Sequence, residues 1–233
     1  KTRHWRLRGL LVTVAMFFFT GEVAVFWGEV FGDLHLFDSS GLGVFGAVVA
    51  IAVYELFHYG YHRAAHEWNW LWRAGHQMHH SAERLDIYGA NYFSLVDMAG
   101  WTLLGSVCLV LGIGITAEAA TLTLLIVTFM AFLSHANIHT PRWLGYITVR
   151  PESHSVHHQR GSHHNNYCEL PVIDMLFGTF VNPKTFVDEC GFYDGASARV
   201  IDMHLFRDVS AAQRGEQQGT SGEVKPLQLG RVQ

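Results

Sequence analysis

Four apolar stretches of membrane-spanning length constrain the fold of this chain more than any other feature. They cover residues of about 7–31, 41–61, 97–117 and 119–138. A helix needs about twenty apolar residues to cross the hydrocarbon core of a bilayer. Because a chain of 233 residues is too short to bury four such helices in a soluble core, the sequence predicts an all-α, integral-membrane four-helix bundle. The first stretch continues past Thr20 without a small-residue cleavage site, so we expect a retained helix and not a signal peptide.

The distribution of charge predicts the orientation of this bundle. Only 15% of the residues are charged and 49% are hydrophobic, which is too apolar for a typical soluble domain. All Lys and Arg residues fall within 1–8, 63–84 and 142–231. By the positive-inside rule, both termini and the segment after the second span face the cytoplasm. The formal net charge of −4 and the lack of a basic, aromatic surface pattern argue against a nucleic-acid partner.

Histidine is the second unusual feature, because ten of the 16 histidines fall into four short boxes. Two boxes have i, i+4 spacing and two have i, i+3, i+4 spacing, so that on a helix each box directs its imidazoles to one side. Ten imidazoles are too many for one ion and suit two, and neutral imidazole is the commonest protein ligand for redox-active metals. The predicted metal ligands are His62, His66, His76, His79, His80, His135, His139, His154, His157 and His158.

The span lengths bring all four boxes to one membrane surface. A helix that begins near residue 42 rises roughly 30 Å by residue 61, so that His62 emerges on the cytoplasmic side, and the fourth span delivers His135 to the same side. Pro141 is expected to end that fourth helix soon after His139. The sequence therefore predicts a cytoplasmic helical cap, formed by residues 62–96 and 139–209, that carries a histidine-rich site for two metal ions.

The remaining histidines and cysteines carry weaker signals. His4, His35 and His204 are isolated and are interpreted as ordinary polar side chains. The roles of His58, His163 and His164 stay open between metal ligand, contact to a ligand and structural residue. The three cysteines are odd in number and widely spaced, which favours reduced, structural thiols over disulfides.

Other site motifs are absent or incomplete. His66-Glu67-Trp-Asn-Trp70 begins like a zinc-protease motif but has tryptophan where the second histidine is required. Gly41-Leu-Gly43-Val-Phe-Gly46 opens a membrane span and follows no strand, so we do not interpret it as a dinucleotide-binding loop. We therefore expect no nucleotide or flavin site, no catalytic side chain beyond the metal ligands, and electrons supplied from outside.

The ordered boxes resemble the fatty acid hydroxylase/sterol desaturase superfamily of integral-membrane, non-haem di-iron enzymes. The resemblance covers residues of about 55–179. It departs from the family pattern at Cys168, where glycine is frequent, and at Ile173, where tryptophan is frequent; neither is a predicted ligand. The matching strings are Tyr59-Gly-Tyr-His-Arg-Ala-Ala-His66, Leu71-Trp-Arg-Ala-Gly-His-Gln-Met-His-His-Ser81, His135 to Thr140, His154-Ser-Val-His-His158, Asn166-Tyr167 and Asp174-Met-Leu-Phe-Gly-Thr179.

The resemblance implies an enzyme with two iron ions that uses O2 to oxidise a C–H bond of a fatty acyl or sterol-like lipid. It also implies an external electron donor of the ferredoxin or cytochrome b5 type. Zinc could replace iron in a preparation, because imidazole sites bind zinc well. Hydroxylation and desaturation begin with the same hydrogen abstraction, so the ligand set leaves both outcomes open.

Two other functions fit the sequence less well than a lipid-oxidising enzyme. A metal-binding or metal-transport membrane protein would distribute polar residues through the membrane depth, whereas here the predicted ligands gather at one end. A catalytically silent lipid-binding relative is disfavoured by the complete ligand set. We expect residues 1–209 to form a single membrane-embedded domain and residues 210–233, which are polar and lack periodicity, to be a flexible tail.

Overall fold

The computed structural model describes residues 3–31 and 34–210, and helices are the only regular elements longer than an isolated bridge in these two segments. The predicted flexible tail lies outside the described residues except for Ser210. The helices, with α-, 3-10 and π-helical segments in chain order, are α1 Trp5–Phe31, η1 Ser40–Phe45, α2 Gly46–Glu67, α3 Asn69–Leu71, η2 Trp72–His76, α4 Gln77–His80, α5 Leu95–Gly105, η3 Ser106–Gly112, α6 Ala117–Ser134, η4 Arg142–Tyr146, α7 Pro151–His157, α8 Pro171–Phe177, η5 Ala196–Ala198 and α9 Val200–His204. The predicted all-α fold class is confirmed.

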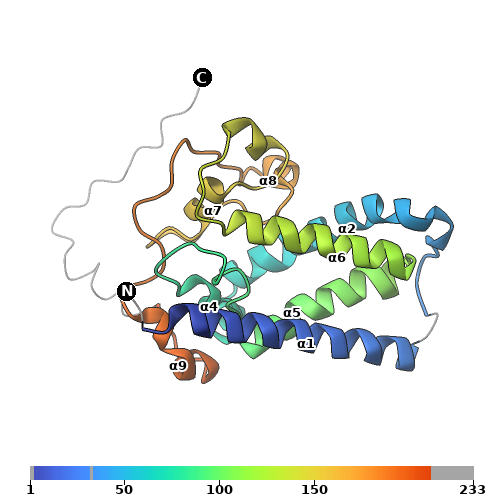
Figure 1. Cartoon of the computed structure of the whole chain (residues 1–233), viewed down its shortest axis with the longest axis horizontal. Helices are drawn as coiled ribbons and strands as arrows, with labels where there is room; N and C mark the ends of the chain where they lie inside the picture. Colours follow the sequence, from blue (N-terminus) through green and yellow to red (C-terminus); the bar gives the residue numbers. More distant parts are fainter. Residues whose placement is uncertain (1–2, 32–33, 211–233) are drawn as a thin grey trace.

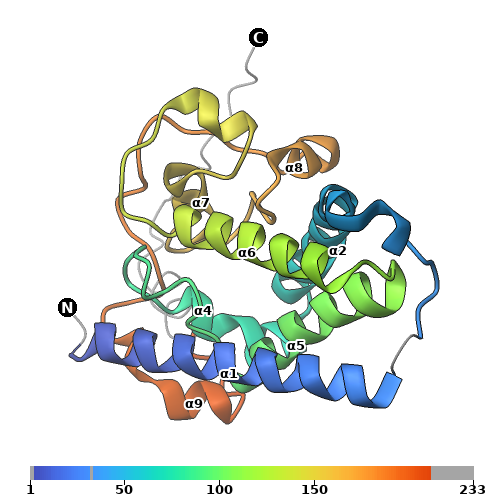
Figure 2. The same cartoon turned by 45° about the vertical axis from the view of Figure 1, so that its right-hand side comes forward.

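The long helices lie side by side, and the short ones gather mainly at one of their ends (Figure 1). α1 and α5 run away from the end where α4 and α7 lie, and α2 and α6 run back toward it (Figure 2). The connector before η1 lies at the opposite end, where the backbone N–H of Leu36 donates to the carbonyl of Leu111 at 2.8 Å. The C-terminal ends of α2 and α6 therefore arrive at the same end of the molecule.

Three helical segments of the described residues are long and apolar enough to cross a membrane: Ser40–Glu67, Leu95–Gly112 and Ala117–Ser134. Less than half of the most apolar window of each is buried within the protein. Their outward surfaces carry large apolar side chains such as Val48, Leu125 and Phe129, which water would solvate poorly and lipid tails solvate well. The first predicted span is also a continuous helix, α1, of 27 residues. The exact four-helix bundle, the membrane side of each end and the cap remain predictions.

Local sequence explains where the spans begin and end. The hydroxyl of Ser94 accepts the N–H of Asp97 at 3.2 Å at the start of α5, and Thr116 Oγ1 accepts that of Ala119 at 3.2 Å at the start of α6; both are N-caps that satisfy free backbone donors. The third span ends at Gly112, earlier than the predicted residue 117, because Gly114 adopts a positive φ of 55° that interrupts a helix.

A buried apolar cluster fixes α1 to the short helices. Trp5, at the start of α1, packs with Tyr92 and Phe192, and the indole N–H of Trp5 donates to the carboxylate of Asp86 at 3.0 Å. Met203 of α9 belongs to the same cluster. These contacts join residues that are distant in the sequence and hold the histidine-bearing segments in place.

Candidate metal centre

The structure gathers nine of the ten predicted ligands into two groups. In each group one ring nitrogen of every histidine lies within 4.8 Å of those of the others, although each group draws its residues from three of the four boxes. The first histidine group contains His62, His66, His76, His80 and His157, and the second histidine group contains His79, His135, His154 and His158.

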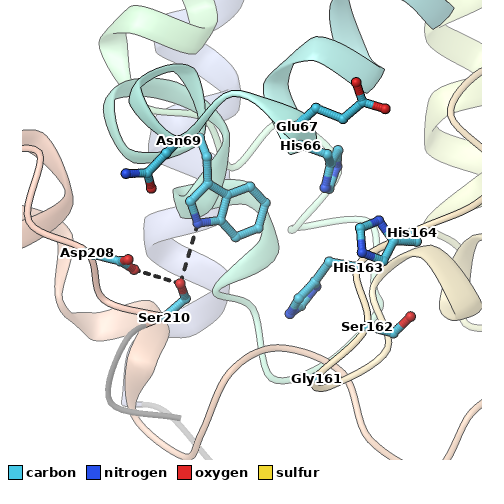
Figure 3. A pocket seen from close by; sticks show the side chains of 10 residues that line it. His66, Glu67, Asn69, Gly161, Ser162, His163, His164, Asp208 and Ser210 are labelled. Atoms are coloured by element: carbon cyan, nitrogen blue, oxygen red, sulfur yellow. Dashed lines mark hydrogen bonds between the residues drawn. The ribbon is translucent and has the colours of Figure 1, made fainter. Parts of the chain in front are cut away.

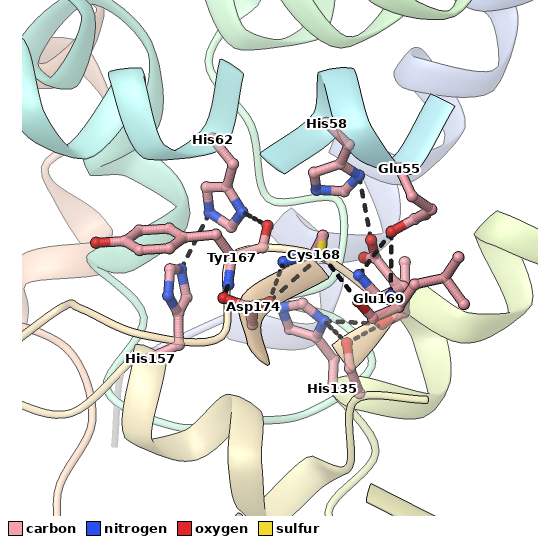
Figure 4. Close-up of polar contacts among 12 residues, drawn as sticks. Glu55, His58, His62, His135, His157, Tyr167, Cys168, Glu169 and Asp174 are labelled. Carbon is pink, nitrogen blue, oxygen red and sulfur yellow. Dashed lines mark hydrogen bonds and ion pairs between the residues drawn. The ribbon is translucent and has the colours of Figure 1, made fainter. Parts of the chain in front are cut away.

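In the first histidine group, unprotonated Nε2 atoms of different histidines lie close together. His62 Nδ1 contacts the carbonyl of Tyr167, and His157 Nδ1 lies 2.7 Å from that of Asn165. A carbonyl only accepts, so both Nδ1 atoms carry the proton and both Nε2 atoms carry a lone pair. Yet His62 Nε2 lies 3.0 Å from His157 Nε2 (Figure 4). Two lone pairs at this distance repel unless a cation lies between them.

His76 completes this arrangement. Its Nδ1 lies 2.9 Å from the buried carboxylate of Asp97, and its Nε2 lies 2.9 Å from His62 Nε2. A carboxylate behind an imidazole fixes the tautomer and increases the basicity of the opposite nitrogen, as is common behind histidine metal ligands. His76 is therefore oriented to give its Nε2 to a cation.

The second histidine group repeats the pattern. His135 Nδ1 lies 2.8 Å from the carbonyl of Ala131. Its Nε2 lies 3.3 Å from that of His79 and 3.2 Å from that of His154, and the Nε2 atoms of His154 and His158 are 3.1 Å apart. Two nitrogens that each lie about 2.1 Å from one ion at right angles are about 3.0 Å apart. The observed spacings fit imidazoles that share an ion, so the residues present suit one metal in each group.

Burial keeps these imidazoles in the form that binds metal. Burial, followed by the neighbouring imidazoles, lowers the pKa of each well below the usual range for histidine in His79, His80, His154, His157 and His158. Burial lowers the pKa of His135 to about 4. The histidines are therefore neutral at physiological pH and each offers a lone pair.

The second histidine box serves both groups and begins in a π-helical turn. The chain from Trp72 to His76 forms η2 and continues directly into α4. His76 and His80 then belong to the first group, while His79 belongs to the second. Such turns are rare and occur preferentially at functional sites, and spacing in the sequence alone gave no sign of this one.

The loop that supports the first group is held by the Asn-Tyr and Asp-to-Thr strings. Asp174 accepts the N–H groups of Tyr167 at 2.9 Å and Cys168 at 3.2 Å, and the hydroxyl of Thr179 at 2.7 Å. The same Tyr167 supplies the carbonyl that orients His62. These motif residues thus position His62 without belonging to the first histidine group themselves.

An ion pair with almost no solvent contact supports α7, which contains the candidate ligands His154 and His157 and is followed directly by His158. Arg150 and Glu152 lie 3.0 Å apart and are each 1% exposed. Glu152 also accepts the N–H and the hydroxyl of Thr140, each at 2.8 Å, and Arg150 Nη1 donates to Asn182 at 2.7 Å. A buried charge pair needs such additional hydrogen bonds to offset its desolvation.

His139 does not join either group, contrary to the prediction. α6 ends at Ser134 and not near residue 138, and residues 136–140 are non-helical. The hydroxyl of Ser134 and the ring of His135 both contact the carbonyl of Ala131, at the point where the helix ends. The i, i+4 argument therefore fails, and the side chain of His139 is 78% exposed beside Glu152.

The three histidines whose roles were left open have distinct surroundings. His163 Nδ1 lies 3.1 Å from His80 Nδ1, and His164 Nδ1 lies 3.3 Å from the hydroxyl of Tyr167. Both are near the first histidine group but outside it. His58 is buried one helical turn before His62, in a third cluster with Glu55 and Glu169.

Sequence reasoning missed the acidic residues around the site. Asp97 behind His76 was not singled out, although it directly precedes the uncharged run of residues 98–117. Glu55 lies inside the second predicted span, residues 41–61, and was not singled out either. An ionisable residue inside a membrane helix is a signal of function and could have identified it.

A polar pocket opens beside the first histidine group. Its volume is about 480 Å³. His66 and His163 lie on its wall (Figure 3), and the Nε2 atom of each is buried without a hydrogen-bond partner. The other lining residues are Glu67, Asn69, Trp72, Gly161, Ser162, His164, Asp208 and Ser210.

Comparison with known proteins identifies the family. The fatty acid hydroxylase family model matches residues 47–179, more than half of the chain. The chain belongs to the fatty acid hydroxylase family. The matched segment contains both histidine groups and all three membrane-length segments in whole or in most part, which together indicate an integral membrane protein.

Individual relatives within this family modify lipids. The chain is 33% identical over 153 residues to the ornithine lipid hydroxylase OlsE of Rhizobium tropici, covering 64% of this chain and 46% of the relative. It is 32% identical over 127 residues to the human alkylglycerol monooxygenase and 31% identical over 130 residues to that of Danio rerio. Those two alignments cover 53% and 54% of this chain and 28% of each relative. The chain thus spans less than half the length of these relatives. No solved structure gives a significant match.

Proposed function

We propose that this chain is a membrane-embedded lipid hydroxylase that binds one iron ion in each histidine group. The observation that carries the proposal is the convergence of lone-pair-bearing Nε2 atoms at spacings of 2.9–3.3 Å in two neighbouring groups. The predicted ligand set is revised to nine histidines, without His139. Bound iron supplies the O2 activation that an unactivated C–H bond requires, with electrons from an external donor of the ferredoxin or cytochrome b5 type.

The residues of the chain hold and orient these ligands. Asp97 and the carbonyls of Tyr167, Asn165 and Ala131 accept the Nδ1 protons and thereby turn each Nε2 inward. Eight of the nine histidines are buried, and His66 is half-buried. Burial excludes water that would otherwise compete for the ligand positions and react with an oxidising species.

Two routes to the site suit the two kinds of reactant. The apolar outer surfaces of α2, α5 and α6 would contact acyl chains in the bilayer. The polar pocket beside His66 would admit O2 and protons from the opposite, aqueous side. The names of the relatives, a lipid hydroxylase and two monooxygenases, support insertion of oxygen over desaturation.

Isotope labelling tests the proposal. The protein is loaded with Fe(II), embedded in bilayers that contain a lipid extract, and supplied with a reductant and isotopically labelled dioxygen. We expect one labelled oxygen atom in a lipid product, measured by mass spectrometry, and no product from His79→Ala. A product that has lost two hydrogens and gained no label would identify a desaturase. A matched control, His139→Ala, should retain the activity; equal lipid profiles for wild type and His79→Ala would refute the enzyme proposal.

A further inference from the structure

A third cluster of possible metal ligands lies one helical turn deeper than the first histidine group. Glu55 and His58 come from α2, and Glu169 comes from the loop before α8. The ligand atoms lie within 4.8 Å of one another, and the three residues are 0%, 7% and 7% exposed. Figure 4 shows the three side chains facing one another, beside His62.

Each of these side chains keeps one buried atom without a hydrogen-bond partner. Glu55 Oε2 accepts the backbone N–H groups of Glu169 at 2.8 Å and Leu170 at 3.2 Å. The unpartnered atoms are Glu55 Oε1, His58 Nδ1 and Glu169 Oε2. His58 Nδ1 lies 3.1 Å from Glu169 Oε2, but the orientation of the two groups does not make a hydrogen bond. Buried polar atoms are almost always satisfied, so three unpartnered atoms within one such cluster require an explanation.

The charges of the two carboxylates in this cluster also favour a bound cation. α2 has no Lys or Arg before Arg63, and Arg63 pairs with Glu67 at 2.6 Å. Among the described residues, the one ion pair of these two carboxylates is that of Glu169 with His58, and no Lys or Arg pairs with either. Burial, followed by the charge of Glu55, raises the pKa of Glu169, because two adjacent buried carboxylates repel each other. A divalent cation balances two carboxylates and one neutral imidazole.

We propose that Glu55, His58 and Glu169 form a third metal site, distinct from the two histidine groups, which binds a divalent ion such as Zn²⁺. Carboxylate oxygen and imidazole nitrogen are ordinary zinc ligands at about 2.0–2.2 Å. The separation of 3.1 Å between His58 Nδ1 and Glu169 Oε2 is a few tenths of an ångström shorter than the roughly 3.4 Å between two ligands on a tetrahedral ion, so a small shift of either side chain would let both bind it. His58 is held between Trp101, with ring centroids 4.5 Å apart, and Tyr54, at 5.7 Å, so its ring is fixed for binding.

The position of this site gives it a structural role. It joins α2 to the loop that contains Tyr167, two residues before Glu169, and the Tyr167 carbonyl orients His62. A third ion would therefore fix the distance between α2 and this loop and stabilise the orientation of a ligand of the first histidine group. This role requires no turnover, so it is tested separately from the proposed hydroxylase activity.

Metal counting tests the inference. The full chain is purified in detergent, stripped of metal, loaded with Zn²⁺, and its zinc content is measured by elemental analysis. We expect three zinc ions per chain in the wild type and two in Glu55→Gln, His58→Gln and Glu169→Gln. The matched control, Glu118→Gln, changes an exposed carboxylate in the first turn of α6 and should retain three.

Two results would overturn the inference. One is a wild-type zinc content of two that falls in His66→Ala and in His79→Ala, because both histidine groups would then be filled and the third cluster empty. The other is a zinc content in Glu169→Gln equal to that of the wild type. If the variants do not fold, anomalous diffraction from zinc in the wild-type protein decides: density between Glu55 and Glu169 supports the site, and its absence refutes it.

Discussion

Replacement of Asp97 by asparagine would test whether the carboxylate that contacts His76 controls metal affinity. Asp97 and His76 are both at most 1% exposed, and the carboxylate lies 2.9 Å from His76 Nδ1. An amide of nearly the same shape can donate to Nδ1. His76 would then carry its proton on Nε2, the atom that lies 2.9 Å from His62 Nε2, and a protonated nitrogen cannot bind a metal.

The expected magnitude follows from the loss of one oriented ligand out of five. Changes to such partners of metal-bound histidines typically cost about 10–100-fold in metal affinity, or about 1.4–2.7 kcal/mol. We expect the affinity of the first histidine group for Fe(II) or Zn²⁺ to fall within this range. The second histidine group, whose imidazoles make no hydrogen bond to Asp97, should keep its affinity.

Competitive titration of the metal-free protein with a chelator of known affinity measures both constants. Tyr61→Phe is the matched control, because the Tyr61 hydroxyl donates to the other oxygen of Asp97 at 3.2 Å and its loss leaves the contact with His76 intact. We expect a change of less than about threefold in this control. An unchanged affinity in Asp97→Asn, or equal weakening of both sites, would refute the assigned role of Asp97.

Three further predictions concern the ligand set, pH and topology. Alanine at His80 or His158 should weaken metal binding by more than about tenfold, whereas His139→Ala should bind metal like the wild type; metal analysis that ranks His139 with the others would restore it as a ligand. The metal-free protein should lose stability as pH falls, because the pKa of His135 is about 4 when folded and about 6.5 when unfolded: the unfolded state binds the proton first, so roughly 2 kcal/mol is lost between pH 7 and pH 5. Thermal unfolding at both pH values measures this loss, and equal melting temperatures would contradict it. Cysteines introduced at positions 84 and 162 should react with an impermeant label only after the membrane is opened, and a cysteine at position 36 should react in intact cells. The native cysteines are all buried, so they should contribute little to the labelling. Labelling of positions 84 and 162 from opposite faces would rule out the shared metal centre.

The histidine boxes show what local spacing can and cannot establish. His62 and His66 lie four residues apart on α2, a continuous helix, so periodicity placed them on one face correctly. His135 and His139 have the same spacing, but α6 ends at Ser134. The spacing predicts a common face only where the backbone is helical, and hydrogen bonds from side chains at the helix end decided where it stopped.

The division of the boxes between two metals depended on tertiary structure as well. His79 and His80 are adjacent in the sequence and enter different groups, because neighbouring helical residues point in directions about 100° apart. Which direction meets which partner depends on how α4 packs against α7 and the ends of α2 and α6. The sequence of the box itself therefore does not specify which of its histidines enters which group.

The sequence by itself determined the class of protein: apolar segments too long and too many for a soluble core of this size, and imidazoles too many to be incidental. Both are properties of composition and spacing, which the chain carries before it folds. Only the tertiary structure decided that nine histidines divide into groups of five and four, that Asp97 lies behind His76, and that Glu55 meets Glu169 across 114 positions of sequence. Contacts between distant residues depend on packing of whole helices and loops, and a single sequence without that packing does not specify which pairs meet.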